Sequence, residues 1–185
     1  MPHASPHVAS PARLGYHAAR MATKYVSRKA ALRQKSQLMS ASEVERTLVR
    51  LAHEIVEKNG GVEGLVLIGI KRRGVPLANR LGKLMERIES KPVPRGVLDI
   101  TFYRDDLSTL GPKPVVQQSD LGVSIENQNV VLVDDVLFTG RTTRAALDAL
   151  FSHGRPGRVQ LCVLIDRGHR ELPVEAAYVG REVQT

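Results

Sequence analysis

Cysteine is nearly absent from the sequence, since Cys162, inside an apolar run, is the only one. A single cysteine cannot form a disulfide within the chain, and this composition suits a reducing cytosol, so we expect a cytoplasmic protein. No apolar stretch approaches the roughly 20 residues that a membrane-spanning helix needs. No long apolar segment of the kind found in secretory signals stands near the N-terminus, and no internal repeat is visible. The 185 residues suffice for one domain with a sizeable core.

The net charge of +8 is concentrated near the N-terminus. Residues 1–42 carry seven lysines and arginines and no acid, which leaves a net charge of +1 for residues 43–185. The overall charge therefore says little about the folded part of the chain. Any face there that binds RNA or DNA must be a local cluster of basic side chains.

Residues 1–41 are interpreted as a basic, disordered extension, because three prolines among the first 11 residues argue against an early helix. An acid-poor start with arginine and serine is also typical of a transit peptide. A start codon upstream of the true one, which would be Met21, is a third interpretation. Residues 42–185 are expected to form the folded domain.

The folded part alternates between two hydrophobic patterns. Short apolar runs indicate strands, and between them apolar residues recur at helical spacing. The order strand, helix, strand, loop, strand, helix, strand predicts an α/β fold with a mainly parallel sheet flanked by helices. The expected elements are a helix from the Ser40–Glu43 capping box to Asn59, strands at 65–70, 97–103, 130–133 and 159–165, helices at 74–88 and 144–150, and a mobile loop at 104–120.

The third predicted strand ends in two acids. Four apolar residues, Val130–Val133, precede Asp134 and Asp135, and a polar turn at 138–142 leads into the next helix. In open α/β sheets ligands bind beyond the carboxyl ends of strands, and backbone amides at a helix start favour an anion such as phosphate. This segment therefore offers acids for hydroxyl groups or a metal beside a cradle for a phosphate. A ligand that carries both a ribose diol and a phosphate fits that pairing.

A second turn, Gly69–Gly74, resembles the first half of a nucleotide-binding P-loop. Val75 stands where that motif requires lysine, so a P-loop nucleotide site is not expected. The turn still places three cations, Lys71 to Arg73, after a predicted strand, where a polyanion such as pyrophosphate would suit them. A solvated turn is the alternative interpretation.

Together these segments resemble the signature motifs of type I phosphoribosyltransferases. Asp134–Thr142 is similar to their phosphoribosyl-pyrophosphate (PRPP) signature, and Gly69–Gly74 is similar to their pyrophosphate loop. Segments 51–54, 98–107 and 165–173 narrow the resemblance to the PyrR family, bacterial pyrimidine-operon regulators that are also uracil phosphoribosyltransferases. The similarity covers about residues 40–185. It implies the type I phosphoribosyltransferase fold with a mobile loop over the site.

The resemblance implies the reaction of uracil with PRPP to give UMP and pyrophosphate. Oxocarbenium character develops on the ribose and negative charge on the departing pyrophosphate, and Mg²⁺ bound through the ligand near Asp134 and Asp135 would neutralise that negative charge. These two acids would hold the ribose hydroxyls, while Arg72, Arg73 and Arg104 would stabilise the leaving pyrophosphate. The loop at 104–120 would close over the site and exclude water.

The resemblance also assigns binding residues. The turn of Lys71, Arg72, Arg73 and Gly74 would form the pyrophosphate loop, and Ile165, Asp166 and Arg167 would lie near the uracil. The expected PRPP-binding residues are Val130, Val131, Leu132, Val133, Asp134, Asp135, Val136, Leu137, Phe138, Thr139, Gly140, Arg141 and Thr142.

Phe138 bears on the choice of base. Purine phosphoribosyltransferases with a similar signature usually carry an acid at this position, and PyrR proteins usually carry tyrosine. Phenylalanine cannot take a proton, which argues against a purine substrate and leaves no general base here. The alternative is that this side chain only packs and that its backbone amide binds the phosphate.

The resemblance implies a second activity, in which UMP or UTP favours binding to the leader mRNA of the pyrimidine operon and promotes transcription attenuation. On the first predicted helix Arg46, Arg50 and His53 form one basic stripe. His169, Arg170 and Arg181 would add further donors for an RNA backbone. A solvated, salt-bridged helix face is the alternative interpretation.

Two positions depart from the PyrR pattern on this predicted RNA surface. Val49 stands where threonine is common. Glu175 stands where arginine is common, and its carboxylate would repel phosphate.

The alternatives to the bifunctional protein are a UMP-sensing RNA regulator with little catalysis and a phosphoribosyltransferase for another base without an RNA role. A homo-oligomer, a dimer or larger, is expected from the family. The chain ends at Thr185, before the further strand and tail that are usual in PyrR proteins, so truncation is one interpretation.

Overall fold

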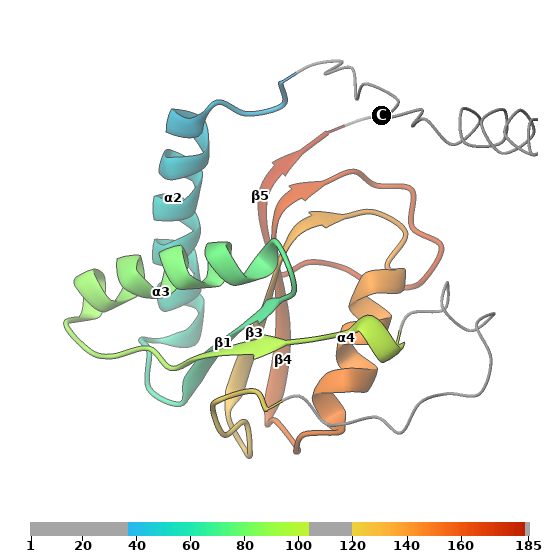
Figure 1. Cartoon of the computed structure of the whole chain (residues 1–185). Coiled ribbons are helices and arrows are strands. Elements are labelled where there is room, and N and C mark those ends of the chain that lie inside the picture. The colour runs from blue at the N-terminus through green and yellow to red at the C-terminus, as the bar shows by residue number, and fades with distance from the viewer. Residues whose placement is uncertain (1–36, 104–119, 184–185) are drawn as a thin grey trace, which may run out of the picture. The chain divides into compact units, whose positions relative to one another are not determined.

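Five parallel strands form one sheet in the order β2-β1-β3-β4-β5 (Figure 1). The computed structural model describes residues 37–103 and 120–183, and its folded unit spans Met39–Thr185. Arg104, most of the predicted loop at 104–120 and nearly all of the predicted extension at 1–41 lie outside the described residues. The strands are β1 (Leu65–Ile70), β2 (Arg95–Leu98), β3 (Asn129–Leu137), β4 (Arg158–Asp166) and β5 (Tyr178–Glu182).

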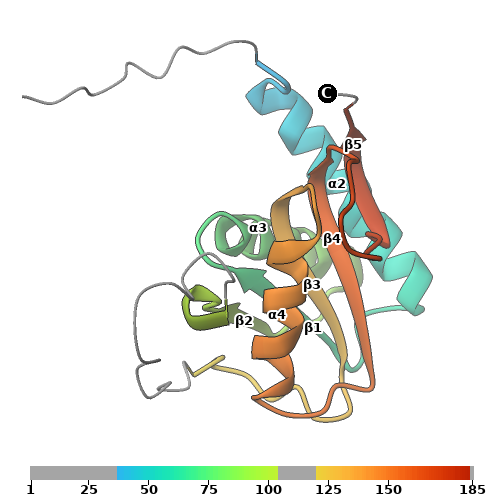
Figure 2. The same cartoon turned by 90° about the vertical axis from the view of Figure 1, so that its right-hand side faces the viewer.

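Three α-helices flank the sheet, and the two hydrophobic clusters show which face each helix covers. They are α2 (Ala41–Asn59), α3 (Gly74–Glu89) and α4 (Arg141–Phe151). The first cluster joins α2 and α3 to Leu65, Leu67 and Val131, whereas the second joins α4 to their sequence neighbours on the other face. Figure 2 shows α4 on the opposite side of the strands from α3. The predicted α/β fold with a parallel sheet is confirmed.

Local sequence explains where these elements begin and end. Ser40 caps α2 in a capping box, in which the Glu43 N–H donates to the Ser40 hydroxyl and the Glu43 carboxylate accepts from the Ser40 N–H. Gly60, in the left-handed conformation, ends the helix, as the sequence predicted. All six residues of β1 are buried, which fits a continuous apolar run covered on both faces.

The prediction of a strand over 97–103 was wrong beyond Leu98. The strand β2 ends at Leu98, and Thr101–Tyr103 forms a 3-10 turn, η3. The Asp99 carboxylate accepts from both the Thr101 N–H, at 3.0 Å, and the Thr101 hydroxyl, at 2.6 Å. This local bonding offers the backbone an alternative to the ladder, so the chain turns here.

The start of α3 approaches β3 more closely than any side chain would permit. A Cβ added to Gly74 would lie 2.1 Å from the Val133 carbonyl oxygen, and nothing in that contact can move without shifting backbone. Because Gly74 has no side chain, the turn at residues 71–73 that precedes α3 can lie directly against β3, which carries Asp134 and Asp135.

Gly74→Ala is expected to lower the free energy of unfolding by about 3 kcal/mol, because the methyl group overpacks against the β3 backbone. Gly60→Ala is the matched control: its added Cβ meets nothing within 4 Å, and only the strain of φ +68° opposes it. That strain costs about 1 kcal/mol. Urea denaturation measures both variants, and equal losses would contradict the close approach at Gly74.

Candidate active site

The parallel register brings three separate segments to one edge of the sheet. Gly69 pairs with Val133 across β1 and β3, and Leu137 pairs with Asp166 across β3 and β4. Because all three strands run in the same direction, the chain leaves them at the same edge. The arginine turn (residues 71–73), the acid pair and the base segment, defined as residues 166–174, therefore surround one site.

Both acids lie within β3, which continues to Leu137. Successive side chains of a strand point to opposite faces, so the two carboxylates differ in surroundings. Asp135 faces the arginine turn, where Arg73 Nη1 lies 3.2 Å from its Oδ2. Asp134 is half-buried, and its Oδ1 accepts from the Asp135 N–H at 2.9 Å. Burial raises the pKa of Asp134 to about 7, and the neighbouring Asp135 charge acts in the same direction.

The phosphate loop, residues 138–142, connects β3 to α4. Gly140 takes φ +91° as the N-cap residue and has no side chain to cap the helix, while the Thr139 hydroxyl accepts from the Arg141 N–H at 3.4 Å. Amide N–H groups at such a helix start are suited to bind an anion. The predicted PRPP residues Val130 to Val133 and Leu137 are at most 2% exposed. What this segment can offer a ligand therefore comes from the acids, the half-buried Val136 and the loop itself.

The arginine turn presents its cations on the surface. Lys71, Arg72 and Arg73 are all exposed, and the peptide bond between Lys71 and Arg72 is cis. Lys71 Nζ lies 3.1 Å from Asp99, and its backbone N–H donates to Leu98. Of the predicted catalytic residues, four lie at this edge of the sheet and Arg104 is outside the described residues.

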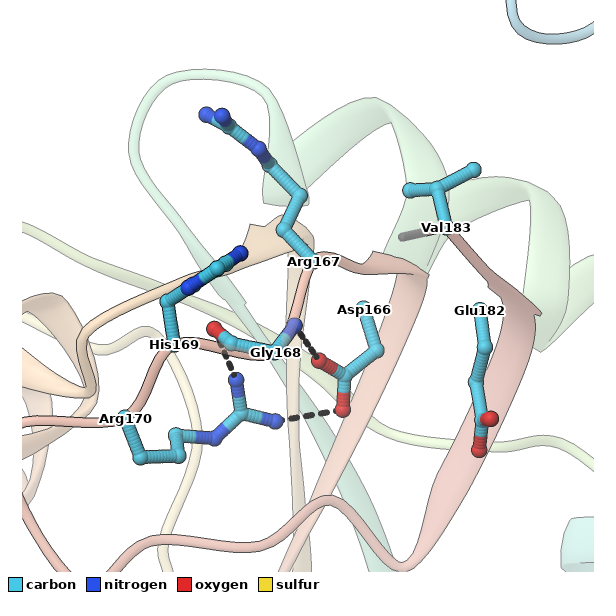
Figure 3. Close-up of a pocket in the computed structure, with 7 residues that line it drawn as sticks. All are labelled: Asp166, Arg167, Gly168, His169, Arg170, Glu182 and Val183. Carbon is cyan, nitrogen blue, oxygen red and sulfur yellow. Dashed lines mark hydrogen bonds and ion pairs between the residues drawn. The ribbon is translucent and has the colours of Figure 1, made fainter. Parts of the chain in front are cut away.

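A cavity of about 450 Å³ opens beside the base segment (Figure 3). Two of the predicted uracil residues, Asp166 and Arg167, line it, whereas Ile165 is buried in the core of β4. The Arg167 guanidinium lies 4.4 Å from the centre of the Phe138 ring, which is 39% exposed. The remaining lining residues are Gly168, His169, Arg170, Glu182 and Val183.

Sequence reasoning missed Glu182 and Val183. Glu182 ends β5 and Val183 follows it, and the Val183 N–H donates to the Asp166 carbonyl at 2.8 Å. Only the pairing of β5 with β4, in which Asp166 faces Glu182, reveals that they reach the cavity. No motif in the sequence marks them.

Asp166, the first residue of the base segment, lines the cavity and is held as a carboxylate. Burial by itself raises its pKa, but hydrogen bonds from the Arg170 side chain and the Gly168 N–H, with the Arg170 charge, outweigh that effect and lower the pKa. Figure 3 shows both contacts. Asp166 is therefore ionised at neutral pH and stands beside the cavity as an ion pair with Arg170.

The residues predicted to bind RNA fall into two groups. Arg46, Arg50 and Arg181 line a groove of about 380 Å³ between α2 and β5, and His53 is exposed further along α2. Arg50 donates to the Val179 carbonyl at 2.9 Å and the Gly180 carbonyl at 2.7 Å. Arg181 pairs with Glu43, also in the groove, at 3.3 Å.

The second group, His169 and Arg170, belongs to the base segment and lines the cavity there. Val49 is 38% exposed on α2, and Glu175 is exposed on the chain leading to β5. The structure thus separates one predicted surface into a groove at α2 and a loop at the site.

Within residues 37–103 and 120–183, no group of three or more histidine, cysteine or acidic side chains could hold a metal ion. Across the same residues, the search for helices long and apolar enough to cross a membrane finds none.

The chain is similar to known proteins in both sequence and fold. The sequence profile of the phosphoribosyl transferase domain matches residues 34–184. Bifunctional protein PyrR of Pelotomaculum thermopropionicum is 56% identical over 153 residues, which are 83% of this chain and 84% of that protein. Bifunctional protein PyrR of Thermus thermophilus is 55% identical over 154 residues, 83% of this chain and 85% of that protein.

Solved structures show the same fold at lower identity. A hypoxanthine phosphoribosyltransferase from Staphylococcus aureus has 24% identity and a TM-score of 0.65, over 80% of this chain and 77% of that one. A hypoxanthine-guanine phosphoribosyltransferase from Bacillus anthracis has 25% identity and a TM-score of 0.63, over 80% and 84%. These structures bear on the fold and not on the base that this chain uses.

The pKa of Asp134 makes stability depend on pH. In the unfolded chain this carboxyl loses its proton near pH 3.8, whereas in the folded chain it keeps the proton until about pH 7. The folded state therefore binds more protons over that window, and the free energy of unfolding falls as the pH rises through it.

We expect the wild-type protein in metal-free buffer to lose about 2 kcal/mol more than Asp134→Asn between pH 5 and pH 7, since asparagine cannot ionise. Urea denaturation of both proteins at the two pH values measures the difference. The comparison cancels other titrating groups that both proteins share. Parallel losses in the two proteins would show that Asp134 titrates outside this window.

Proposed function

The chain belongs to the phosphoribosyl transferase domain family and, within it, to the bifunctional PyrR proteins, and on this premise we propose how its residues act in that function. It is a pentosyltransferase that converts uracil and PRPP to UMP and pyrophosphate, and it regulates pyrimidine-operon expression. The observation that carries the enzymatic proposal is the meeting of arginine turn, acid pair, phosphate loop and base cavity at one edge of the sheet.

Each segment takes one part of PRPP. The phosphate loop binds the 5′-phosphate through its amides and the hydroxyls of Thr139 and Thr142, the acid pair holds the ribose hydroxyls, and the arginine turn binds the pyrophosphate. The contact of Arg73 with Asp135 at 3.2 Å supports this division. When PRPP binds, the Arg73 guanidinium pairs with the pyrophosphate instead of Asp135, and the Asp135 carboxylate accepts hydrogen bonds from the ribose hydroxyls.

The reaction breaks the bond between the anomeric carbon and the pyrophosphate oxygen and forms a bond from that carbon to N1 of uracil. The N1 proton is released to solvent, because Phe138 offers no base. The bond electrons leave with the pyrophosphate, where Arg72, Arg73 and the predicted Arg104 stabilise the added charge. The predicted loop at 104–120 excludes water from the reacting carbon.

Phosphoribosyltransferases generally use Mg²⁺ with PRPP, and the donor set of this chain fits a metal that arrives with its substrate. Two adjacent carboxylates are available, without a third ligand among the described residues. One or two carboxylates plus substrate phosphates are the usual surroundings of Mg²⁺ in such sites. Asp134 and Asp135 would hold Mg²⁺ directly or through water, and the bound ion would neutralise negative charge on the pyrophosphate oxygens.

The base site supports a pyrimidine. Asp166 and Arg167 supply an acceptor and a donor at the cavity, and the half-exposed Phe138 ring supplies an apolar surface without a titratable group. A phosphoribosyltransferase for another base is the alternative, and the nucleotide formed from each base distinguishes the two.

For RNA we propose that the groove of Arg46, Arg50 and Arg181, with His53 beside it, contacts the phosphates of the operon leader mRNA when UMP or UTP is bound. The exposed Val49 lies on the same helix and lacks the hydroxyl common in relatives. A function on PRPP and mRNA places the protein in the cytoplasm, and assembly into a homo-oligomer stays a prediction from the family.

The wild-type protein with PRPP and Mg²⁺ is expected to form UMP from labelled uracil and no nucleotide from hypoxanthine, cytosine or orotate. Asp135→Asn is expected to lower kcat/KM about 100-fold, because the amide neither takes the ribose hydroxyls as strongly nor attracts the metal. Asp148→Asn on the exposed face of α4 is the control and should retain wild-type activity. Nucleotide formed from another base, with none from uracil, would reassign the substrate.

Arg46→Ala is expected to weaken binding of the operon leader RNA several-fold and to lower the slope of log K against log salt by about 1, since one phosphate contact is lost. A gel shift with and without UMP at several salt concentrations measures both. Arg158→Ala, at the amino end of β4, is the matched control. Wild-type affinity and slope in Arg46→Ala would remove this groove from the RNA surface, and UMP-dependent binding without catalysis would favour the regulator alone.

A further inference from the structure

Arg170 has its guanidinium turned into the protein. Nε donates to the Val174 carbonyl at 3.0 Å, and Nη1 donates to the Phe138 carbonyl at 2.8 Å and the Gly168 carbonyl at 3.0 Å. Nη2 forms an ion pair with Asp166. Four of its five N–H groups thus have acceptors within the protein, and its side chain is only 24% exposed.

These acceptors belong to two different parts of the site. Phe138 begins the phosphate loop, whereas Asp166, Gly168 and Val174 belong to the base segment. Arg170 therefore bridges the loop proposed to hold the 5′-phosphate and the segment proposed to hold the base. A planar guanidinium with fixed donor directions suits this role better than a flexible ammonium.

Further contacts join the same two segments. The Glu171 and Leu172 N–H groups both donate to the Thr139 carbonyl, at 3.0 and 3.1 Å. Arg141 Nε donates to the Glu171 carboxylate at 2.7 Å. A Cβ added to Gly140 would lie 3.3 Å from Leu172, so the phosphate loop is packed directly on the base segment.

We propose that Arg170 is a positioning residue that fixes the phosphate loop against the base segment and so couples the binding of PRPP to the shape of the base site. The inference rests on the proposed phosphoribosyl transfer and deepens it. It also replaces the predicted role of Arg170 as an RNA contact, because a guanidinium committed to four internal acceptors has little left to offer a phosphate.

The kinetic signature follows from which part of PRPP is affected. The 5′-phosphate takes no part in bond breaking, and we expect it to contribute uniform binding, equal in the ground state and the transition state. Loss of its positioning is therefore expected to raise KM for PRPP about tenfold in Arg170→Met while kcat stays within about threefold. Arg170→Lys keeps the charge beside Asp166 but not the fork, and an intermediate KM is expected.

Amide hydrogen exchange gives a second readout that does not need catalysis. The Glu171 and Leu172 amides, which bond to Thr139, are expected to exchange faster in Arg170→Met, while amides of β1 and β3 keep wild-type protection and report an intact fold. Isothermal titration of PRPP with Mg²⁺ gives the affinity even if uracil proves not to be the substrate. Failure of the proposed uracil reaction is thereby separated from failure of this inference.

Arg95→Met is the matched control. Its side chain is 27% exposed and pairs with Glu86 at 2.9 Å, but it lies at the start of β2, away from the carboxyl ends of the strands. The proposal is overturned if Arg170→Met binds PRPP within about twofold of wild type, or if Arg95→Met weakens binding as much. If Arg170→Met does not fold, Arg170→Lys decides by the same criterion. Unchanged PRPP affinity with lost RNA binding would return Arg170 to the RNA surface.

Discussion

Parallel pairing of β3 with β1 on one side and β4 on the other is the constraint on which the rest of the molecule depends. Because of this pairing, three chain segments leave the sheet at the carboxyl ends of the strands. Gly69 and Val133, which pair there, are more than 60 residues apart in the sequence. Helices cover both faces of these strands, so polar groups can emerge only at the strand ends. The acids of β3 lie where burial gives way to solvent, which is why one carboxyl is held in a partly apolar setting and its neighbour meets an arginine.

Residues whose role is set by local sequence could be predicted. The capping box at Ser40, the glycine end of α2, the buried runs of β1 and β3 and the acids after Val133 all have patterns that span only a few residues. The turn at Asp99 was missed because the alternating hydrophobic pattern of residues 97–103 favoured a strand. The hydrogen bond from the Thr101 N–H to the Asp99 carboxylate, which ends the strand, was not evident from that pattern. The strand β5 was not predicted, since it is short and only Tyr178 among its residues is fully buried.

Arginines show the limit of sequence reasoning most clearly. Arg50 and Arg170 were both assigned to one basic surface because their charge alone is visible in the sequence. The structure gives Arg50 two carbonyls of β5 and Arg170 three carbonyls and a carboxylate at the site. These partners are more than 100 residues away for Arg50 and 32 residues away for the farthest acceptor of Arg170. Fold topology, and not local composition, therefore decides that Arg50 stays at the surface of the groove, with a side chain 52% exposed, whereas Arg170, at 24%, is turned into the protein.

The contacts of α2 with β5 also bear on how the protein behaves in a crowded solution. The strand β5 is the last of the sheet, and such a strand presents unpaired backbone groups to which a second chain can add. Here Arg50 holds the carbonyls of Val179 and Gly180, and Lys58 holds that of Ala177 just before the strand. Successive carbonyls of a strand point to alternate sides, so one of the two that Arg50 holds faces away from β4, and another strand could pair there only by displacing Arg50. The arginine that joins α2 to β5 thus also makes this side of the sheet less accessible to a pairing strand.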